Sequence, residues 1–301
     1  MIDFKPLALE QKADFDRILQ HCSFRGCEYS FANLYIWGRQ KAAFIGDTLV
    51  FFSQFNRKSV YPFPVGGKDL KPALDAIIHD AQARGISCRF TSLSQDDCAL
   101  LEQLYPGKFR FHFDRDFFDY VYAIEDLAQL KGKKYQKKRN HLNRFLQEHP
   151  DYRVEPIDQS NISVVSQLVQ QWYDKRQAED PTADTLMEQA AIRKALQHMQ
   201  TLQMEGLLLY DGQVPLAMTM GSFLSEDTFD VHFEKAIDPA AYPAINREFA
   251  AYLHNKYPQL AFLDREDDMG LEGLRKAKMS YYPHHLVEKS WAHLLEDGYD
   301  Y

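Results

Sequence analysis

Residues 206–236 read GLLLYDGQVPLAMTMGSFLSEDTFDVHFEKA and decide the fold that the sequence predicts. This segment contains three runs with the composition of β-strands, at 206–210, 214–223 and 228–236. The first two runs flank Asp211-Gly212, a short loop of the kind found in tight hairpins. The segment therefore predicts a three-stranded meander.

Outward from this meander, both halves of the chain show the same order of elements: helix, helix, meander, helix, strand, helix, strand. In the C-terminal half we expect helices at 160–177, 185–204, 241–255 and 270–280, and further strands at 261–265 and 285–291. In the N-terminal half we expect helices at 10–21, 30–37, 69–84 and 95–104, and strands at 42–45, 48–52, 59–63, 86–93 and 109–124. This order predicts a mixed α/β fold with an N-terminal domain at 1–127, a connecting helix at 128–150 and a C-terminal domain at 151–301.

Composition excludes several classes of protein. With 301 residues, 45% hydrophobic and 26% charged, the chain is long and apolar enough for a sizeable core, which excludes disorder. A net charge of -8 argues against unspecific coating of nucleic acid or anionic membrane. No run of 18 apolar residues occurs, residues 1–10 lack a secretory signal, and the four cysteines form no CxxC pair. We therefore expect a cytoplasmic protein with free thiols and no integral membrane segment.

Residues 130–150 read LKGKKYQKKRNHLNRFLQEHP and form a local exception to the acidic balance. Seven basic residues and no acidic one lie within 131–144. A solvated helix face and a binding surface for an anionic partner both fit such a run. Helical spacing puts Arg139 on the packing side, where it needs either an internal carboxylate or a ligand phosphate.

The third strand of the meander alternates apolar and ionisable side chains. Phe229, Val231 and Phe233 are expected on one face, and Asp230, His232 and Glu234 on the other. On an edge strand this is ordinary solvent exposure, whereas on a central strand the polar face would line a cleft. In the second case Glu234 or His232 is a candidate general base.

Residues 263–281 read LDREDDMGLEGLRKAKMSY and place several carboxylates between a predicted strand and a predicted helix. Ligands often bind at such junctions, but acidic residues before a helix also stabilise its dipole. Because no His or Cys accompanies these carboxylates in the sequence, we expect no transition-metal site, while Mg²⁺ stays open. A glycine-rich turn for a pyrophosphate is missing at 239–246, and Gly66-Gly67 is a weak substitute in the first half.

Three segments together carry a family resemblance: LKGKKYQKKRNHLNRF at 130–145, FDVHFEKAIDPAAYPAINREFA at 229–250 and LDREDDMGLEGLRKAKMSYYP at 263–283. The chain resembles a bacterial family related to the C-terminal catalytic domain of phosphatidylglycerol lysyltransferase. The resemblance implies two tandem GNAT-like (acyl-CoA N-acyltransferase-like) domains, kinship with the Fem peptidyltransferases, and aminoacyl transfer from charged tRNA. Those lipid-modifying relatives join this domain to a membrane-embedded portion; because we expect no integral membrane segment in this chain, the resemblance leaves the acceptor open.

The resemblance also implies a set of site residues. It singles out Glu234 and His232, which the strand pattern already makes candidates for the catalytic base. The candidates for binding the substrate or donor are Lys133, Lys137, Lys138, Arg139, Asn140, Tyr242, Asn246, Arg265, Glu266, Asp268, Arg275 and Lys278. No metal ligand and no required cofactor are among these expectations.

Three functions fit these observations. The first is a transferase that moves an activated acyl or aminoacyl group, from aminoacyl-tRNA or another phosphate-bearing donor, to an amine or hydroxyl; it needs no covalent intermediate, and no GxSxG motif occurs. The second is an acyl-CoA-dependent N-acyltransferase. The third is a non-catalytic module that binds RNA or a phosphorylated ligand through the basic helix.

Overall fold

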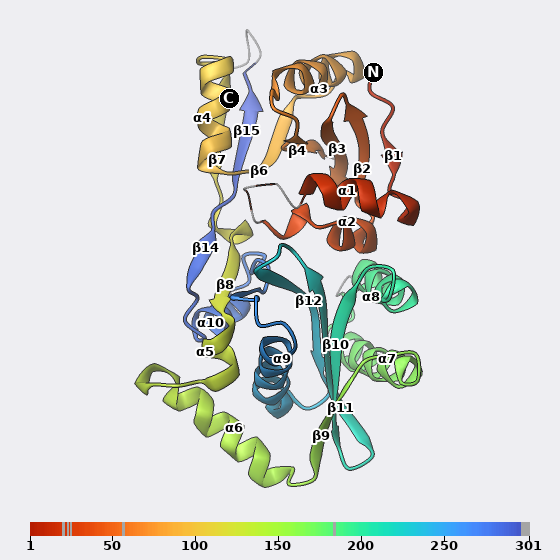
Figure 1. The fold of residues 1–301 in the computed structure, drawn as a ribbon, viewed down its shortest axis with the longest axis vertical. Coiled ribbons are helices and arrows are strands. Elements are labelled where there is room, and N and C mark those ends of the chain that lie inside the picture. The colour runs from red at the N-terminus through yellow and green to blue at the C-terminus, as the bar shows by residue number, and fades with distance from the viewer. Residues whose placement is uncertain (20–21, 23, 25, 56–57, 183–184, 296–301) are drawn as a thin grey trace. The chain divides into compact units, whose positions relative to one another are not determined.

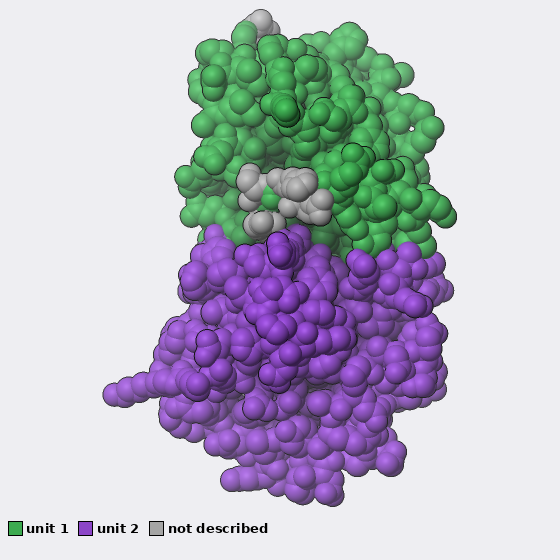
Figure 2. Space-filling model, in the orientation of Figure 1, with its two compact units in different colours: residues 1–119, 267–271, 287–301 green, residues 120–266, 272–286 purple. Residues whose placement is uncertain are grey.

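The computed structural model describes residues 1–19, 22, 24, 26–55, 58–182 and 185–295. The chain forms two compact units, shown in Figure 2. Unit 1 comprises residues 1–119, 267–271 and 287–301, and unit 2 comprises residues 120–266 and 272–286. The units are thus interleaved in sequence, whereas the expected ranges 1–127, 128–150 and 151–301 are contiguous. As a division into folding domains, those ranges stay a prediction.

Unit 1 is built on a mixed sheet with the strand order β1-β2-β3-β4-β6-β15-β7. Its strands are β1 (Lys5–Pro6), β2 (Gln40–Ile45), β3 (Thr48–Phe55), β4 (Lys58–Pro62), β6 (Arg89–Leu93), β7 (Phe109–Phe113) and β15 (Ser290–Leu294), and β5 (Val65–Gly66) pairs with β3. Its helices are α1 (Lys12–Leu19), α2 (Phe31–Trp37), α3 (Lys71–Arg84) and α4 (Gln95–Leu104). Leu74 and Ile77 of α3 join Tyr61, Phe90 and Ala292 of the sheet in one buried core.

Unit 2 is built on a second mixed sheet with the strand order β14-β8-β13-β12-β11-β10-β9. Its strands are β8 (Asp119–Ala123), β9 (Tyr152–Pro156), β10 (Met204–Asp211), β11 (Val214–Phe223), β12 (Thr228–Ala236), β13 (Phe262–Asp264) and β14 (His285–Val287). Its helices are α5 (Ile124–Gln129), α6 (Gln136–Glu148), α7 (Ile162–Glu179), α8 (Leu186–His198), α9 (Tyr242–Lys256) and α10 (Glu272–Met279). Helix α9 covers one face of the meander and α7 the other (Figure 1). The mixed α/β architecture and the meander at 206–236 are confirmed.

Two strands are exchanged relative to the expected repeat. The strand expected at 109–124 breaks into β7 and β8, and the strand expected at 285–291 breaks into β14 and β15. Strand β15 inserts between β6 and β7 of the first sheet, while β8 pairs with β13 of the second. The strands of each sheet therefore do not all come from one contiguous half of the chain. Local pattern could not show this, because each strand is apolar enough for either sheet.

A β-bulge changes which side chains share a face of β12. Met220 pairs with Phe233 and Gly221 with Val231, so His232 is the extra residue on β12. The strand therefore reverses its alternation after Val231, and the expectation that Glu234 shares a face with Asp230 was wrong. Gly221 is required here, because a Cβ at this position would lie 1.9 Å from the Asp230 carbonyl oxygen.

Candidate functional site

An opening between two parallel strands of unit 2 places the first group of candidate residues. Strands β12 and β13 pair from Thr228↔Phe262 to Asp230↔Asp264, and the pairing ends there although β12 continues to Ala236. Glu234 lies on the part of β12 that extends beyond its pairing with β13, and Arg265 follows β13 directly. Ligands commonly bind at the carboxyl ends of parallel strands. We call the group formed by Lys138, Glu234, Asn246, Arg265 and Tyr281 the splay site.

A buried ion pair bridges this opening. The Nη2 atom of Arg265 lies 3.0 Å from Glu234 Oε1, and the two side chains are only 14% and 15% exposed. Asn246 of α9 is buried beside them. With its amide oxygen turned toward Arg265, Asn246 accepts hydrogen bonds from both terminal guanidinium nitrogens, at 2.6 and 3.0 Å. The bulge in β12 produces this contact, because it turns Glu234 to the face that α9 covers.

Lys138 adds a second cation to the splay site. Its Nζ atom lies 3.6 Å from the centroid of the Tyr281 ring, a close cation–π contact. Tyr135, fully buried just before α6, donates a hydrogen bond to the Tyr281 carbonyl oxygen (3.1 Å) and so anchors the helix beside that ring. Burial, and then repulsion by Arg265 and Lys137, lower the pKa of Lys138 to about 8. Among the described residues, Lys138 has no carboxylate partner, so its charge favours an anionic ligand.

Two further predicted residues support the splay site. Lys278 donates hydrogen bonds from Nζ to the carbonyl oxygens of Arg265 (2.5 Å) and Glu266 (3.1 Å) and thereby holds the turn after β13. Tyr242, at the start of α9, is half-buried. Burial, and then the negative charge of Glu234, raise the pKa of the Tyr242 phenol. Lys278 therefore positions Arg265 through the backbone, and Tyr242 lies close enough to the Glu234 carboxylate to feel its charge.

The remaining candidates of the basic segment lie outside this cluster. Arg139 donates hydrogen bonds to the carbonyl oxygens of Leu130 and Gly132 and to the side chain of Gln136. Among the described residues no carboxylate pairs with Arg139, because backbone carbonyls and Gln136 hold its guanidinium. The expectation that Arg139 contacts a ligand stays a prediction. Lys133, Lys137 and Asn140 are exposed on the surface of this segment.

His232 and Glu266 form a different group on the other side of the bulge. We call Ser222, Asp230, His232 and Glu266 the histidine cluster. His232 Nε2 lies 2.8 Å from Ser222 Oγ, and Nδ1 lies 3.1 Å from Glu266 Oε1 and 3.3 Å from Asp230 Oδ2. The His232 side chain is fully buried. His232 and Glu234 are consequently not alternatives for one position.

Two acidic-segment candidates, Asp268 and Arg275, were also not brought into the splay site. Asp268 is fully buried in unit 1, where it accepts a hydrogen bond from the Gly270 N–H (3.0 Å) and lies 3.6 Å from Arg115 Nη1. Its contacts are those of a turn-stabilising carboxylate. Arg275 is half-buried on α10, the helix that also carries Lys278.

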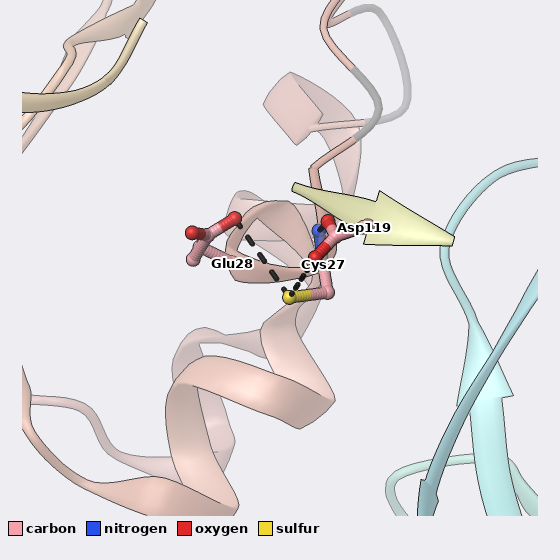
Figure 3. Close-up of side chains that lie close together, drawn as sticks. All are labelled: Cys27, Glu28 and Asp119. Carbon is pink, nitrogen blue, oxygen red and sulfur yellow. Dashed lines mark hydrogen bonds between the residues drawn. The ribbon is translucent and has the colours of Figure 1, made fainter. Parts of the chain in front are cut away.

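A buried cluster in unit 1 was missed by the sequence analysis. Figure 3 shows the Cys27 thiol between the carboxylates of Glu28 and Asp119. Lys289 completes this group, which we call the lysine cluster: its Nζ lies 2.8 Å from each carboxylate and 3.5 Å from Cys27 Sγ. Burial raises the pKa of Asp119 to about 7, against the attraction of Lys289. No sequence signal unites these residues, because the fold brings them together from three distant segments.

The start of α9 is the position at which the sequence lacks a glycine-rich turn for the pyrophosphate of acyl-CoA. Pro239 and Pro243 have no N–H, and the N–H groups of Ala240 and Ala241 donate to the side chain and carbonyl of Asp238. The Tyr242 N–H donates to the Pro239 carbonyl. Because these amides are missing or already bonded, the turn does not fit a pyrophosphate.

The glycine pair of unit 1 also has a structural explanation. A Cβ on Gly67 would lie 2.4 Å from Thr48 Oγ1, and one on Gly66 would lie 2.9 Å from the Asp47 carbonyl oxygen. Both glycines have positive φ angles. Close packing against the β2–β3 turn therefore accounts for Gly66-Gly67 without a ligand.

The fold and the splay site define a class of protein: a mixed α/β fold with a cluster of charged side chains at the carboxyl ends of two parallel strands. The chain belongs to the family described as phosphatidylglycerol lysyltransferase, C-terminal, which it matches over residues 20–293. The family resemblance drawn from the sequence is thereby confirmed. Family and fold support an aminoacyl transferase at the level of class. Among the residues that the structure describes, no helix combines the length and apolar character needed to cross a membrane.

Solved structures show the same fold. A conserved protein of unknown function from Bacteroides thetaiotaomicron is 37% identical, with a TM-score of 0.91 over 98% of this chain and all of that one. L-PGS from Bacillus licheniformis is 15% identical, with a TM-score of 0.70 over 98% of this chain and 94% of that one. FemX is 11% identical, with a TM-score of 0.63 over 97% of each chain. The expected fold class, shared with Fem-type proteins, is confirmed.

The chain spans about half the length of the curated relative that it matches. This relative is an uncharacterized protein from Mycoplasmoides gallisepticum, 22% identical over 175 residues, which are 57% of this chain and 54% of the relative.

Proposed function

We propose that the protein transfers an aminoacyl group from aminoacyl-tRNA, or another phosphate-bearing donor, to an amine or hydroxyl acceptor. The observation that carries this proposal is Lys138, a half-buried ammonium that has no carboxylate partner among the described residues and lies beside Arg265. The splay site holds two cations, Lys138 and Arg265, and one carboxylate, Glu234. Its net positive charge favours an anionic ligand. Family membership supports the same class of reaction.

The reaction follows from the groups at the site. The acceptor's nitrogen or oxygen bonds to the ester carbonyl carbon, and the bond from that carbon to the tRNA ribose oxygen breaks. Glu234 takes the acceptor's proton on Oε2, since Oε1 pairs with Arg265, and the proton then passes to the departing ribose oxygen. Lys138 and Arg265 stabilise the oxyanion formed between these steps. No covalent enzyme intermediate is needed.

The start of α6 supplies a second part of the proposal, a surface for donor phosphates. Lys133 and Lys137 are exposed there, whereas Lys134 pairs with Asp126 and Arg144 with Glu148. Because exposed lysines contact phosphates without sequence preference, we expect binding of tRNA to weaken steeply as salt rises.

The test is a transfer assay with radiolabelled aminoacyl-tRNAs and a panel of acceptors that includes amines, peptides and phospholipid vesicles. Glu234→Gln should lower transfer by about 100-fold or more, within the range for general-base removal, while tRNA binding is retained. The matched control is Glu272→Gln, which changes an exposed carboxylate paired with Lys276 and should leave transfer unchanged. Equal rates for Glu234→Gln and wild type would refute the assigned base. Binding without transfer in wild type would leave only the binding-module function, and acyl-CoA-dependent transfer would favour the second alternative.

A further inference from the structure

The histidine cluster holds a ring nitrogen between two carboxylates. His232 Nδ1 lies 3.1 Å from Glu266 Oε1 and 3.3 Å from Asp230 Oδ2. One oxygen from each carboxylate and one nitrogen of His232 all lie within 4.8 Å of one another. The side chains of Asp230 and His232 are fully buried, and that of Glu266 is 22% exposed. Any cation that enters would thus pass along Glu266.

The hydrogen bond of His232 Nε2 determines the role that Nδ1 can have. His232 Nε2 is hydrogen-bonded to Ser222 Oγ at 2.8 Å. If Nε2 carries the proton, the Nδ1 lone pair faces two negative oxygens, and if Nδ1 carries it, one hydrogen serves two carboxylates. In the first case the Nδ1 lone pair can bind a divalent cation together with one oxygen of each carboxylate. A histidine whose second nitrogen is held by a hydrogen bond is the usual arrangement at metal sites.

The backbone adopts two uncommon conformations to assemble these atoms. His232 is the extra residue of the β12 bulge, which turns it toward Ser222 and Asp230. Glu266 has a φ of 55°, in the left-handed region that non-glycine residues rarely occupy. Asp264 holds that turn by accepting a hydrogen bond from the Glu266 N–H (2.8 Å). Such local strain is frequently found at functional sites.

We propose that Asp230, His232 and Glu266 bind one first-row divalent transition-metal ion. One imidazole nitrogen with two carboxylate oxygens suits ions such as Zn²⁺ or Mn²⁺, and three protein ligands leave at least one coordination position for water. The site is separate from the splay site, but Glu266 directly follows Arg265. Metal binding would therefore also hold the backbone that presents Arg265. The proposal does not depend on the transferase activity.

The lysine cluster of unit 1 offers a contrast and a control. Its Cys27, Glu28 and Asp119 atoms also lie within 4.8 Å of one another. There the Lys289 ammonium lies 2.8 Å from both carboxylates and occupies the position of a cation. A metal ion would have to displace this buried ammonium, so we assign the metal to the histidine cluster.

The test uses the full chain, stripped with a chelator and titrated with Co²⁺ and Zn²⁺. Metal content after gel filtration gives the stoichiometry, Co²⁺ absorption reports the ligands, and calorimetry gives the affinity for Zn²⁺. We expect one ion per chain, Co²⁺ bands without a thiolate charge-transfer component, and Zn²⁺ binding weakened more than about 10-fold by Glu266→Gln. Cys27→Ser is the matched control and should bind as wild type does.

Three results would overturn the proposal. These are no bound ion, a thiolate band that disappears in Cys27→Ser, or equal affinity for Glu266→Gln and wild type. A measurement on the wild-type chain avoids dependence on the folding of a variant: the ¹⁵N resonance of His232 Nδ1 should shift when Zn²⁺ binds. An unchanged resonance at saturating Zn²⁺ would equally exclude His232 as a ligand.

Discussion

The charge state of Lys138 should control the binding of an anionic donor between pH 7 and pH 9. Because burial and neighbouring cations lower its pKa to about 8, about nine-tenths of the chains carry the ammonium at pH 7 and about one-tenth at pH 9. If binding requires this charge, the association constant falls about tenfold across this range. Tyr281, against which Lys138 packs, does not titrate there, since burial raises its pKa to about 12.

The assay is fluorescence anisotropy of labelled, deacylated tRNA at constant ionic strength, because its phosphodiesters keep their charge over this range. Lys138→Arg keeps the cation up to much higher pH and should give a nearly flat profile. Lys137→Arg, a change of the adjacent exposed lysine, should retain the tenfold fall. Parallel slopes for wild type and Lys138→Arg would refute the reasoning, because some other group would then cause the pH dependence.

The lowered pKa of Lys138 also makes the free energy of unfolding depend on pH. The folded chain releases the Lys138 proton near pH 8, whereas the unfolded chain holds it until about pH 10.5. Within this window the unfolded state binds more protons, so this group makes the free energy of unfolding rise with pH. Lys138→Met should remove that rise in urea unfolding at pH 8 to 10, compared with wild type.

Three further predictions concern the fold around these clusters. Lys289→Met leaves Glu28 and Asp119 without their ammonium partner and should lower the free energy of unfolding by about 3–5 kcal/mol in urea titrations. This loss should become smaller as pH falls, because protonation removes the repulsion between the two carboxylates. Gly221→Ala should cost about 3 kcal/mol and reduce tRNA binding, because the added Cβ collides with a β12 carbonyl; a fully stable variant would argue against the bulge. Arg139→Ala should lower the free energy of unfolding by about 1 kcal/mol through lost hydrogen bonds to carbonyls, with little change in transfer at saturating donor. A strong loss of transfer without loss of stability would identify Arg139 as a ligand-binding residue.

Strong local patterns gave the elements correctly. The meander at 206–236, the helix that follows it and the stop of α3 at Gly85 all agree with the structure, because hairpin glycines and helical spacing act over a few residues. The partners of β8 and β15 could not be obtained in this way. Which sheet a strand joins depends on residues far away in the chain, and both sheets accept an apolar strand.

Four of the five residues of the splay site were candidates from the sequence, and the structure brings them together: Lys138, Glu234, Asn246 and Arg265. Tyr281 was not a candidate, and the contacts between these residues were not predicted. The internal partners of Arg139 were not foreseen, because sequence spacing shows the face of a helix but not the carbonyl groups that precede it. Lys289 was missed because a lone lysine within a predicted strand has the pattern of a surface charge until its two carboxylate partners are known.

A single extra residue in β12 explains why one predicted polar face became two sites. Strict alternation would have placed His232 and Glu234 side by side as competing candidates for one base. The bulge at His232 instead sends Glu234 toward Asn246 and α9, and leaves His232 with Ser222 and Asp230. The two sites remain coupled through the chain, because Arg265 pairs with Glu234 while its neighbour Glu266 contacts His232. Zn²⁺ titration should therefore perturb the Arg265 side-chain resonances in wild type and leave them unchanged in Glu266→Gln; no perturbation in wild type would show that the two sites are independent.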